Sequence, residues 1–140
     1  MELKVRCIHP DARIPAYGHP GDAGLDLFSV ADHELGPAAA FAVPTGIQVA
    51  IPAGFVGLIW DKSGIALNGV HRLAGVIDAG YRGEILVVMI NLGKQPFIIH
   101  KGMKVAQMLV QPVASVTVLQ SETLDDTSRG AHGFGSTGLY

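Results

Sequence analysis

The chain has 140 residues, of which 49% are hydrophobic and 16% charged, so the composition predicts one globular domain and excludes a disordered chain. Its formal net charge of -2 argues against a nucleic acid polymer as partner, although a local cationic cluster can still bind a small anion. The single Cys7 excludes an intrachain disulfide, and no Cys/His cluster has the spacing of zinc ligands.

Short apolar runs, many with a period of two, predict strands along most of the chain. In chain order they cover residues 3–8, 24–30, 41–43, 46–51, 55–60, 76–77, 84–91, 96–100, 105–110 and 113–119. The run 84–91 is apolar on both faces and is expected at the centre of the fold. Only residues 63–67 suggest a helix, about one turn long. With 18 Gly and 8 Pro to form turns, the chain is predicted to be all-β, a distorted, jelly-roll-like β-barrel.

The composition changes once, after Leu119. Residues 120–140 are polar and rich in glycine, with almost no apolar periodicity. We therefore expect a β-barrel over residues 1–119 and a flexible C-terminal arm over residues 120–140.

Asp78 is the first candidate for chemistry. It follows the apolar pair Val76-Ile77 and precedes Gly80 and Tyr81, so an acid is expected at the end of a strand beside flexible backbone and an aromatic ring. Such an acid suits a general base that faces a pocket, whereas a turn-forming Asp at a strand end is the structural alternative.

The glycine-rich arm combines groups that suit a nucleotide. Arg129 can pair with phosphate oxygens, Phe134 can stack on a ring, and backbone amides near Gly135 can approach a ligand closely. Ser136 and Thr137 add hydroxyl groups. A disordered Gly/Ser tail is the alternative, but an Arg and a Phe among the glycines favour a lid over phosphate and base.

Three further segments carry polar candidates with a structural alternative each. Lys62-Ser63-Gly64 opens the short helix and can form a phosphate cradle, or Ser63 can simply cap the helix. Asp26 lies between two leucines and can hold a metal directly or through water, or it can face solvent on an alternating strand. Gln107 can bind a base or a phosphate, or it can lie at a sheet edge.

Taken together, the five segments resemble, in order and spacing, the five motifs of the homotrimeric deoxyuridine triphosphatases (dUTP diphosphatases, with a dUTPase-like β-clip fold). The matching segments are Ala23-Gly24-Leu25-Asp26-Leu27, Lys62-Ser63-Gly64, the run from Gly75 to Gly83, Lys104-Val105-Ala106-Gln107 and the run from Arg129 to Gly138. The match covers residues 22–138, and five motifs in order are highly specific.

The resemblance implies a mechanism and an assembly. Asp78 would activate the water that attacks the α-phosphate of dUTP, giving dUMP and pyrophosphate, and Mg²⁺ would be held through water near Asp26. The reaction limits uracil in DNA and supplies dUMP for thymidylate synthesis. The remaining roles fall into three groups: Lys62, Ser63, Gly64, Gln107 and Arg129 at phosphate; the backbone of Gly75, Val76 and Ile77, with Leu86, at uracil and Tyr81 at the sugar; and Phe134, Gly135, Ser136 and Thr137 in the lid.

Each active site would combine motifs from three identical subunits, with no membrane partner. The start of the chain lacks the apolar run of a secretion signal, and the apolar run 85–90 is too short for a membrane span, so we expect an intracellular, cytoplasmic protein.

The chain departs from the family pattern at four places. Lys62 and Lys104 stand where Arg is usual, and each offers a point charge in place of a planar fork. His132 stands where a small residue is usual, and Arg72 falls near the place of an Asn that contacts uracil in some members.

Two alternatives remain open. A dCTP deaminase or bifunctional deaminase–diphosphatase would need an extra acid/base group, for which only Glu84 is available near Asp78. A catalytically weak, nucleotide-binding regulator is the second alternative.

Overall fold

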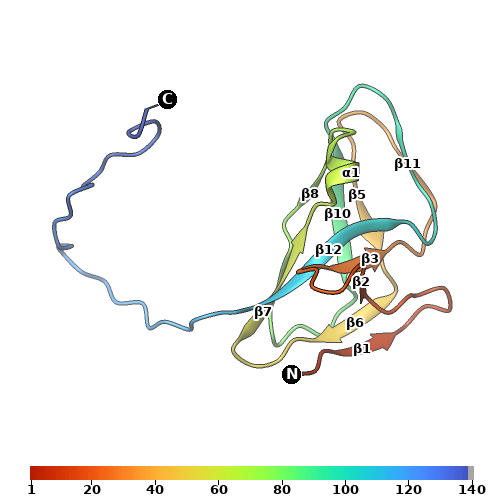
Figure 1. Ribbon diagram of the computed structural model, residues 1–140, viewed down its shortest axis with the longest axis horizontal. Helices are drawn as coiled ribbons and strands as arrows, with labels where there is room; N and C mark the ends of the chain where they lie inside the picture. The colour runs from red at the N-terminus through yellow and green to blue at the C-terminus, as the bar shows by residue number, and fades with distance from the viewer. Residues whose placement is uncertain (139–140) are drawn as a thin grey trace.

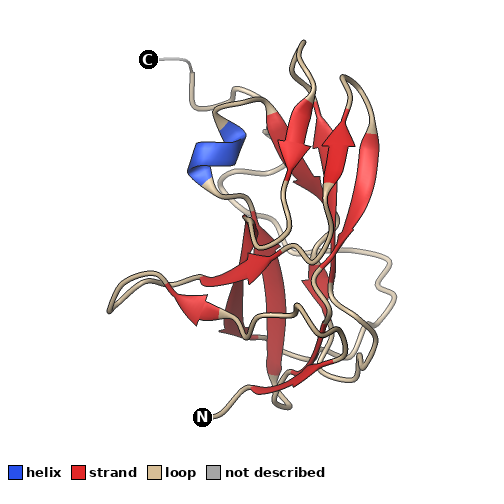
Figure 2. Cartoon of the chain, turned by 90° about the vertical axis from the view of Figure 1, so that its right-hand side faces the viewer, coloured by secondary structure: helices blue, strands red, loops and turns tan. Residues whose placement is uncertain are grey.

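The computed structural model describes residues 1–138 and is built almost entirely of β-strands (Figures 1 and 2). The strands are β1 (Lys4–Cys7), β2 (Ala16–Tyr17), β3 (Leu25–Phe28), β4 (His33–Leu35), β5 (Ala40–Pro44), β6 (Ile47–Ala50), β7 (Phe55–Trp60), β8 (Val70–Leu73), β9 (Val76–Ile77), β10 (Leu86–Asn91), β11 (Phe97–Ile99) and β12 (Lys104–Pro112). The short helix α1 (Ser63–Ala66) is the one helix among them. The all-β prediction is therefore confirmed.

The strands form four antiparallel sheets rather than one closed barrel: β1-β6, β5-β10-β8, β11-β4 and β2-β3-β12-β7-β9. Strand β10 is central in its sheet, as its apolar run predicts, and β12 is central in the largest sheet. The sheets bury one apolar core, whose largest fully buried side chains include Leu27, Leu35, Ile47, Ile85, Met89, Ile99 and Met108.

Strands β2, β4 and β8 have no apolar run, and the sequence does not predict them. In β8 the residues Val70-His71-Arg72-Leu73 alternate buried and exposed positions, but the polar pair in the middle hides the pattern. The strand forms because its backbone pairs with β10, from Val88 opposite Leu73 to Asn91 opposite Val70. Pairing partners distant in the chain therefore define strands that local composition does not.

The predicted strand at residues 113–119 is wrong. Strand β12 ends at Pro112, and residues 113–138 contain no helix or strand. Val116, Val118 and Leu119 are 77%, 88% and 81% exposed, so the alternating apolar pattern has no pairing strand within residues 1–138. Figure 1 shows this C-terminal segment (residues 113–138) running away from the sheets. Residues 139 and 140 of the predicted arm lie outside the described residues, and the division at Leu119 stays a prediction.

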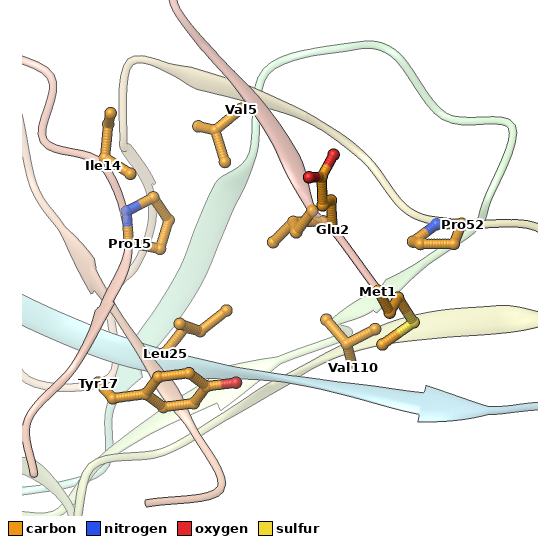
Figure 3. A pocket seen from close by; sticks show the side chains of 10 residues that line it. Met1, Glu2, Val5, Ile14, Pro15, Tyr17, Leu25, Pro52 and Val110 are labelled. Carbon is orange, nitrogen blue, oxygen red and sulfur yellow. The ribbon is translucent and has the colours of Figure 1, made fainter. Parts of the chain in front are cut away.

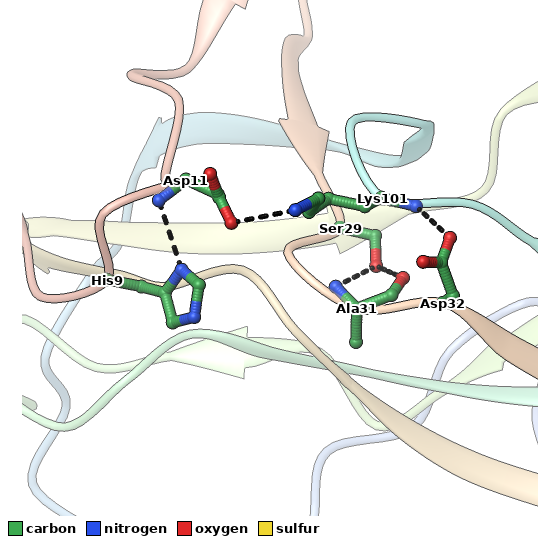
Figure 4. A network of polar contacts seen from close by, with 6 residues as sticks. All are labelled: His9, Asp11, Ser29, Ala31, Asp32 and Lys101. Atoms are coloured by element: carbon green, nitrogen blue, oxygen red, sulfur yellow. Dashed lines mark hydrogen bonds and ion pairs between the residues drawn. The ribbon is translucent and has the colours of Figure 1, made fainter.

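A polar network on the surface joins three loops of the sheet region (Figure 4). The Lys101 ammonium lies 3.0 Å from Asp11, and the Lys101 backbone N–H donates to Asp32 at 2.9 Å. Contact with Lys101 lowers the pKa of Asp11, and Asp11 in turn raises the pKa of Lys101. Ser29 closes the adjoining turn by donating to the carbonyl of Ala31 at 2.7 Å. The network fixes the loops that flank β3 and β12, on which candidate site residues lie.

Candidate functional site

Asp26, on β3, is a buried carboxylate between two lysines. It is only 4% exposed, so the alternative of a solvent-facing acid is wrong. Its Oδ1 lies 2.5 Å from Nζ of Lys62, and its Oδ2 lies 2.6 Å from Nζ of Lys104. Burial favours the neutral acid, but hydrogen bonds from Lys104 and Lys62, with their charges, outweigh it and hold the pKa of Asp26 below its ordinary 3.8. The three side chains form a cluster with a formal charge of +1.

Gln107 joins this cluster from β12. It lies opposite Asp26 on one side and opposite Trp60 on the other, so the interpretation of an edge residue is wrong. Its Nε2 donates to the backbone carbonyl of Asp61 at 2.9 Å. A Cβ at Gly24 would lie 2.3 Å from Oε1 of Gln107, so only glycine leaves room for this side chain. Segments one, two and four of the sequence pattern therefore meet on one side of the sheet.

The segment Lys62-Ser63-Gly64 begins helix α1, next to this cluster. Lys62 is the N-cap and makes no side-chain capping bond, so Ser63 is not the capping residue that the alternative interpretation required. Ser63 and Gly64 are both exposed, and the hydroxyl of Ser63 is accessible to a ligand.

The third segment lines a cavity of about 230 Å³ at the end of the same sheet. Its lining contains the residues predicted at the uracil edge, the sugar and the attacking water: Gly75, Val76, Ile77, Asp78, Tyr81 and Leu86, together with Leu73, Ala74, Glu84 and Val88. Gly75 has φ +113, and its position has no room for a side chain, since a Cβ there would lie 3.0 Å from Cβ of Ile59. Its carbonyl accepts from the Ile59 N–H at 2.8 Å, which attaches the cavity wall to β7.

Asp78 directly follows β9 and is exposed, so the strand that it ends is not a buried one. The neighbouring Val76 is 65% exposed, so β9 is an open edge in the single chain. The hydroxyl of Tyr81 donates to the carbonyl of Glu84 at 2.9 Å, and a Cβ at Gly83 would lie 2.3 Å from that hydroxyl. Glycine at position 83 therefore lets the Tyr81 ring fold across the turn.

A second cavity, of about 290 Å³, lies between the N-terminal segment and the loop before β2 (Figure 3). Its lining is mostly apolar, with side chains such as Val5, Ile14 and Val110, and Glu2 is its one charged side chain. It contains none of the predicted site residues, so its larger volume does not make it the candidate site.

The cluster of Asp26, Lys62 and Lys104 (the lysine cluster) lies far from the cavity of the same chain. Across the sheet, Asp26 on β3 lies opposite Gln107 on β12, which in turn lies opposite Trp60 on β7. On the other side of β7, Gly57 lies opposite Ile77 on β9. Strand spacings of ~4.8 Å and a rise of ~3.4 Å per residue put Asp26 and Asp78 on the order of 20 Å apart.

The fifth segment lies on the C-terminal segment. Phe134 is fully exposed, with φ +40, and the following Gly135 has φ +94. Nε of Arg129 donates to the His132 carbonyl at 3.0 Å, which forms a small turn. Arg129, Ser136 and Thr137 are exposed as well. Figure 1 shows the part of the C-terminal segment that carries these residues away from the sheets.

One group of side chains near the cavity was not predicted from the sequence. The Arg72 guanidinium lies over the Trp60 ring at 4.9 Å, and Asp61 accepts from the Arg72 backbone N–H at 2.8 Å. The other oxygen of Asp61 lies 2.5 Å from Nδ1 of His71. Only the departure from the family pattern at Arg72 gave a signal for it.

A sequence model described as dUTPase matches residues 10–138 of the chain. The chain belongs to the dUTPase family. It is 48% identical to the deoxyuridine 5'-triphosphate nucleotidohydrolase of Clostridium kluyveri, with 99% of each chain covered. It is 46% identical to the enzyme of the same name from Mycolicibacterium gilvum, covering 97% of this chain and 94% of the relative. As a dUTPase, the chain is a hydrolase that acts on dUTP.

Solved dUTPase structures have the same fold. A dUTPase of Staphylococcus bacteriophage 80alpha, solved with dUpNHpp, matches with a TM-score of 0.93 and 28% identity, covering 99% of both chains. The dUTPase from phage phi11 of S. aureus, with a coordinated structural Mg(II) ion, matches with a TM-score of 0.83 and 27% identity, covering 88% of this chain and 98% of that one. No helix within residues 1–138 has the length and apolar character needed to cross a membrane.

Proposed function

We propose that the chain cleaves dUTP to dUMP and pyrophosphate, with a water activated by Asp78 attacking the α-phosphate. The observation that carries the proposal is the 230 Å³ cavity, because it places Asp78 on the same wall as Gly75, Val76, Ile77 and Tyr81. A small cavity with the Asp78 carboxylate among its lining groups suits a ring that enters the cavity while its phosphates stay outside.

Uracil recognition rests on backbone groups in this proposal. The walls of the cavity are mostly apolar, with Leu73, Leu86 and Val88 among the lining residues. Apolar walls exclude water, so the polar edge of uracil would pair with the backbone of residues 75–77. Tyr81, held by its hydrogen bond to the Glu84 carbonyl, would pack under the sugar. The fixed ring leaves little room for a 2′-hydroxyl.

The triphosphate would bind at the lysine cluster. The two positive charges of Lys62 and Lys104 exceed the single negative charge of Asp26, so the cluster attracts an anion. The exposed Ser63 hydroxyl can donate a hydrogen bond to that anion. Gln107 lies beside the cluster and can reach the same oxygens. Arg129 in the C-terminal segment would pair with the terminal phosphate, while Phe134 covers the base and Gly135, Ser136 and Thr137 close the lid.

Mg²⁺ fits this site only through water and substrate. Both Asp26 oxygens already accept from a lysine, and residues 1–138 contain no group of three His, Cys, Asp or Glu side chains that could hold a metal. Each carboxylate oxygen has a second lone pair, so Asp26 can still accept a hydrogen bond from a water of the metal. The ion would neutralise charge on the triphosphate, which assists attack on phosphorus.

The proposed active unit is a homotrimer with shared sites. The separation between Asp26 and Asp78, on the order of 20 Å from strand geometry, is too large for one nucleotide to bridge them on one chain. The exposed edge strand β9 and the C-terminal segment, which leaves the sheets at Pro112, are both available to another copy. A site that combines the cavity of one chain with the lysine cluster of a second and the lid of a third removes the difficulty.

The deaminase alternative depends on Glu84, which lines the cavity. Its Oε1 accepts from the Gly46 N–H at 2.8 Å, so the carboxylate is occupied in holding the neighbouring loop. This contact favours a structural role for Glu84 and triphosphate hydrolysis as the function.

A nucleotide panel tests the proposal. With Mg²⁺ and dUTP, dCTP, dTTP or UTP, we expect pyrophosphate from dUTP alone. Release of ammonia from dCTP would identify a deaminase, and no reaction with any nucleotide would support the regulatory alternative. Mixing inactive Asp78→Asn and Asp26→Asn chains tests the shared site, because mixed trimers would contain some intact sites. No recovery of activity on subunit exchange would contradict the sharing.

A further inference from the structure

We propose that Arg72 and Trp60 form a strut that holds the cavity wall in its open backbone conformation, which makes Arg72 a positioning residue for the nucleotide base. The inference rests on the proposed function of the cavity. Neither residue lies in the lining of the cavity, so the role is exerted through the backbone at Ala74 and Gly75.

The backbone at the cavity wall is in a conformation that alanine avoids. Ala74 has φ +58 and Gly75 has φ +113, two consecutive residues in the left-handed half of backbone space. For a residue with a Cβ this conformation is disfavoured by roughly 5- to 30-fold in population. Contacts around Ala74 must therefore hold its backbone in this conformation. Because Ala74 and Gly75 both line the cavity, the conformation also shapes the cavity wall.

Arg72 supplies the contact to Ala74. Its Nη1 donates to the Ala74 carbonyl at 2.6 Å, two residues along the chain. That bond spans the beginning of the left-handed turn and orients the peptide unit between Ala74 and Gly75. On the far side of this peptide unit, the Gly75 carbonyl accepts from the Ile59 N–H at 2.8 Å. The wall is thus held from both sides.

The Arg72 guanidinium is fixed in place by an aromatic ring rather than by a carboxylate. It lies over Trp60 at 4.9 Å, and no ion pair with an acid is found for it within residues 1–138. Its Nε is the one buried side-chain nitrogen or oxygen in that part of the chain without a hydrogen-bond partner. A planar cation stacked on a ring keeps one orientation, which lysine in the same place would not.

The backbone at the base of the strut is also bonded to the lysine cluster of the same chain, which in the proposed trimer serves a different active site. Asp61 accepts from the Arg72 N–H, and its own carbonyl accepts from Gln107. Lys62, which follows Asp61 directly, contacts Asp26. Losing the Arg72 side chain removes its bond to the Ala74 carbonyl and leaves these backbone contacts in place, so the wall of the base cavity would shift while no phosphate-binding residue is removed. This predicts a change in KM and in base selectivity more than in kcat.

The test compares Arg72→Ala, Arg72→Lys and the double variant Arg72→Ala/Ala74→Gly in the full-length chain. The control is Arg13→Ala, which removes an arginine at 5.6 Å over the Phe28 ring, away from the cavity. We expect KM for dUTP to rise about tenfold in Arg72→Ala and several-fold in Arg72→Lys, with kcat changed less. We expect Arg13→Ala to match the wild type.

The double variant gives the decisive result. Glycine adopts a positive φ without the penalty, so Ala74→Gly should recover most of the lost affinity if the strut acts through this backbone. A KM for Arg72→Ala within twofold of the wild type, or no recovery in the double variant, would overturn the proposal. If Arg72→Ala does not fold, Trp60→Leu tests the same strut, and an unchanged KM there would refute it. A wild type that leaves dUTP intact would refute the proposed function instead.

Discussion

Replacing Asp26 with Asn tests whether this acid holds the fold together as well as serving the site. Asp26 is 4% exposed, and each of its oxygens contacts one lysine. Breaking a fully buried ion pair costs about 3–5 kcal/mol. The side chains of Lys62 and Lys104 are 30% and 50% exposed, so they can return partly to water. Because Asn also keeps one acceptor, we expect a loss of about 2–3 kcal/mol in the free energy of unfolding.

The loss should depend on pH in a defined direction. The folded-state pKa of Asp26 lies below its ordinary 3.8, so the carboxylate stabilises the fold above that pH and ceases to do so as the pH falls through the folded-state pKa. Asp26→Asn should therefore lower the melting temperature by about 10 °C at pH 7. In urea titrations, the difference from the wild type should begin to shrink once the pH falls to about 4.

The matched control is Glu34→Gln, which changes an exposed carboxylate on β4. Its melting temperature should equal that of the wild type at pH 7 and at about pH 4. Equal stability of Asp26→Asn and wild type at pH 7 would refute the structural role and leave only a role toward the metal. A difference that stayed constant down to pH 3 would show that the charge of Asp26 is not its cause.

Three more predictions concern activity. Asp78→Asn should lower kcat by about 10²–10⁴ while dUpNHpp still binds in calorimetry, because only the base is lost, and near-normal kcat would contradict that role. Truncation after Leu124 removes Arg129 and Phe134 of the proposed lid and should abolish most turnover, with the mass in sedimentation that of the proposed trimer; a monomer would show that the tail is structural. A chelator should stop hydrolysis and Mg²⁺ restore it, whereas the melting temperature without nucleotide should stay constant, since we expect the substrate to carry the metal.

The strands that the sequence predicts are those with a local apolar pattern. Strand β7 has the predicted bounds 55–60, and β10 is central as its doubly apolar run requires. Strands β2 and β4 are two and three residues long and exist through their partners, β3 and β11. The opposite error occurs at 113–119, where the pattern of a strand is present but the described part of the chain offers no partner strand. The local apolar pattern gives a segment its strand propensity, but the presence of a pairing partner decides whether a strand forms.

The candidate site divides in the same way. The predicted site residues of the cavity lie close together in the sequence, from Gly75 to Leu86, so the sequence could name them before the structure placed them around one cavity. Contacts between distant residues had no such signal. Lys62 and Lys104 meet at Asp26 from positions 36 and 78 residues away, and sequence spacing does not reveal that both reach the same carboxylate.

The contacts of Lys62 and Lys104 show what lysine does at two places where the family pattern usually has Arg. An arginine fork would occupy both oxygens of one carboxylate at once, whereas a lysine ammonium occupies one. Here Lys62 takes Oδ1 of Asp26 and Lys104 takes Oδ2, so two point charges together give the coverage of one fork. The cluster keeps its net charge of +1, so the proposed attraction for a triphosphate would persist with lysine at both places. The change is in hydrogen-bond direction. An ammonium can turn to donate toward an arriving phosphate oxygen, whereas a guanidinium donates only within its own plane. The lysines should therefore weaken geometric selection among phosphates more than they weaken binding.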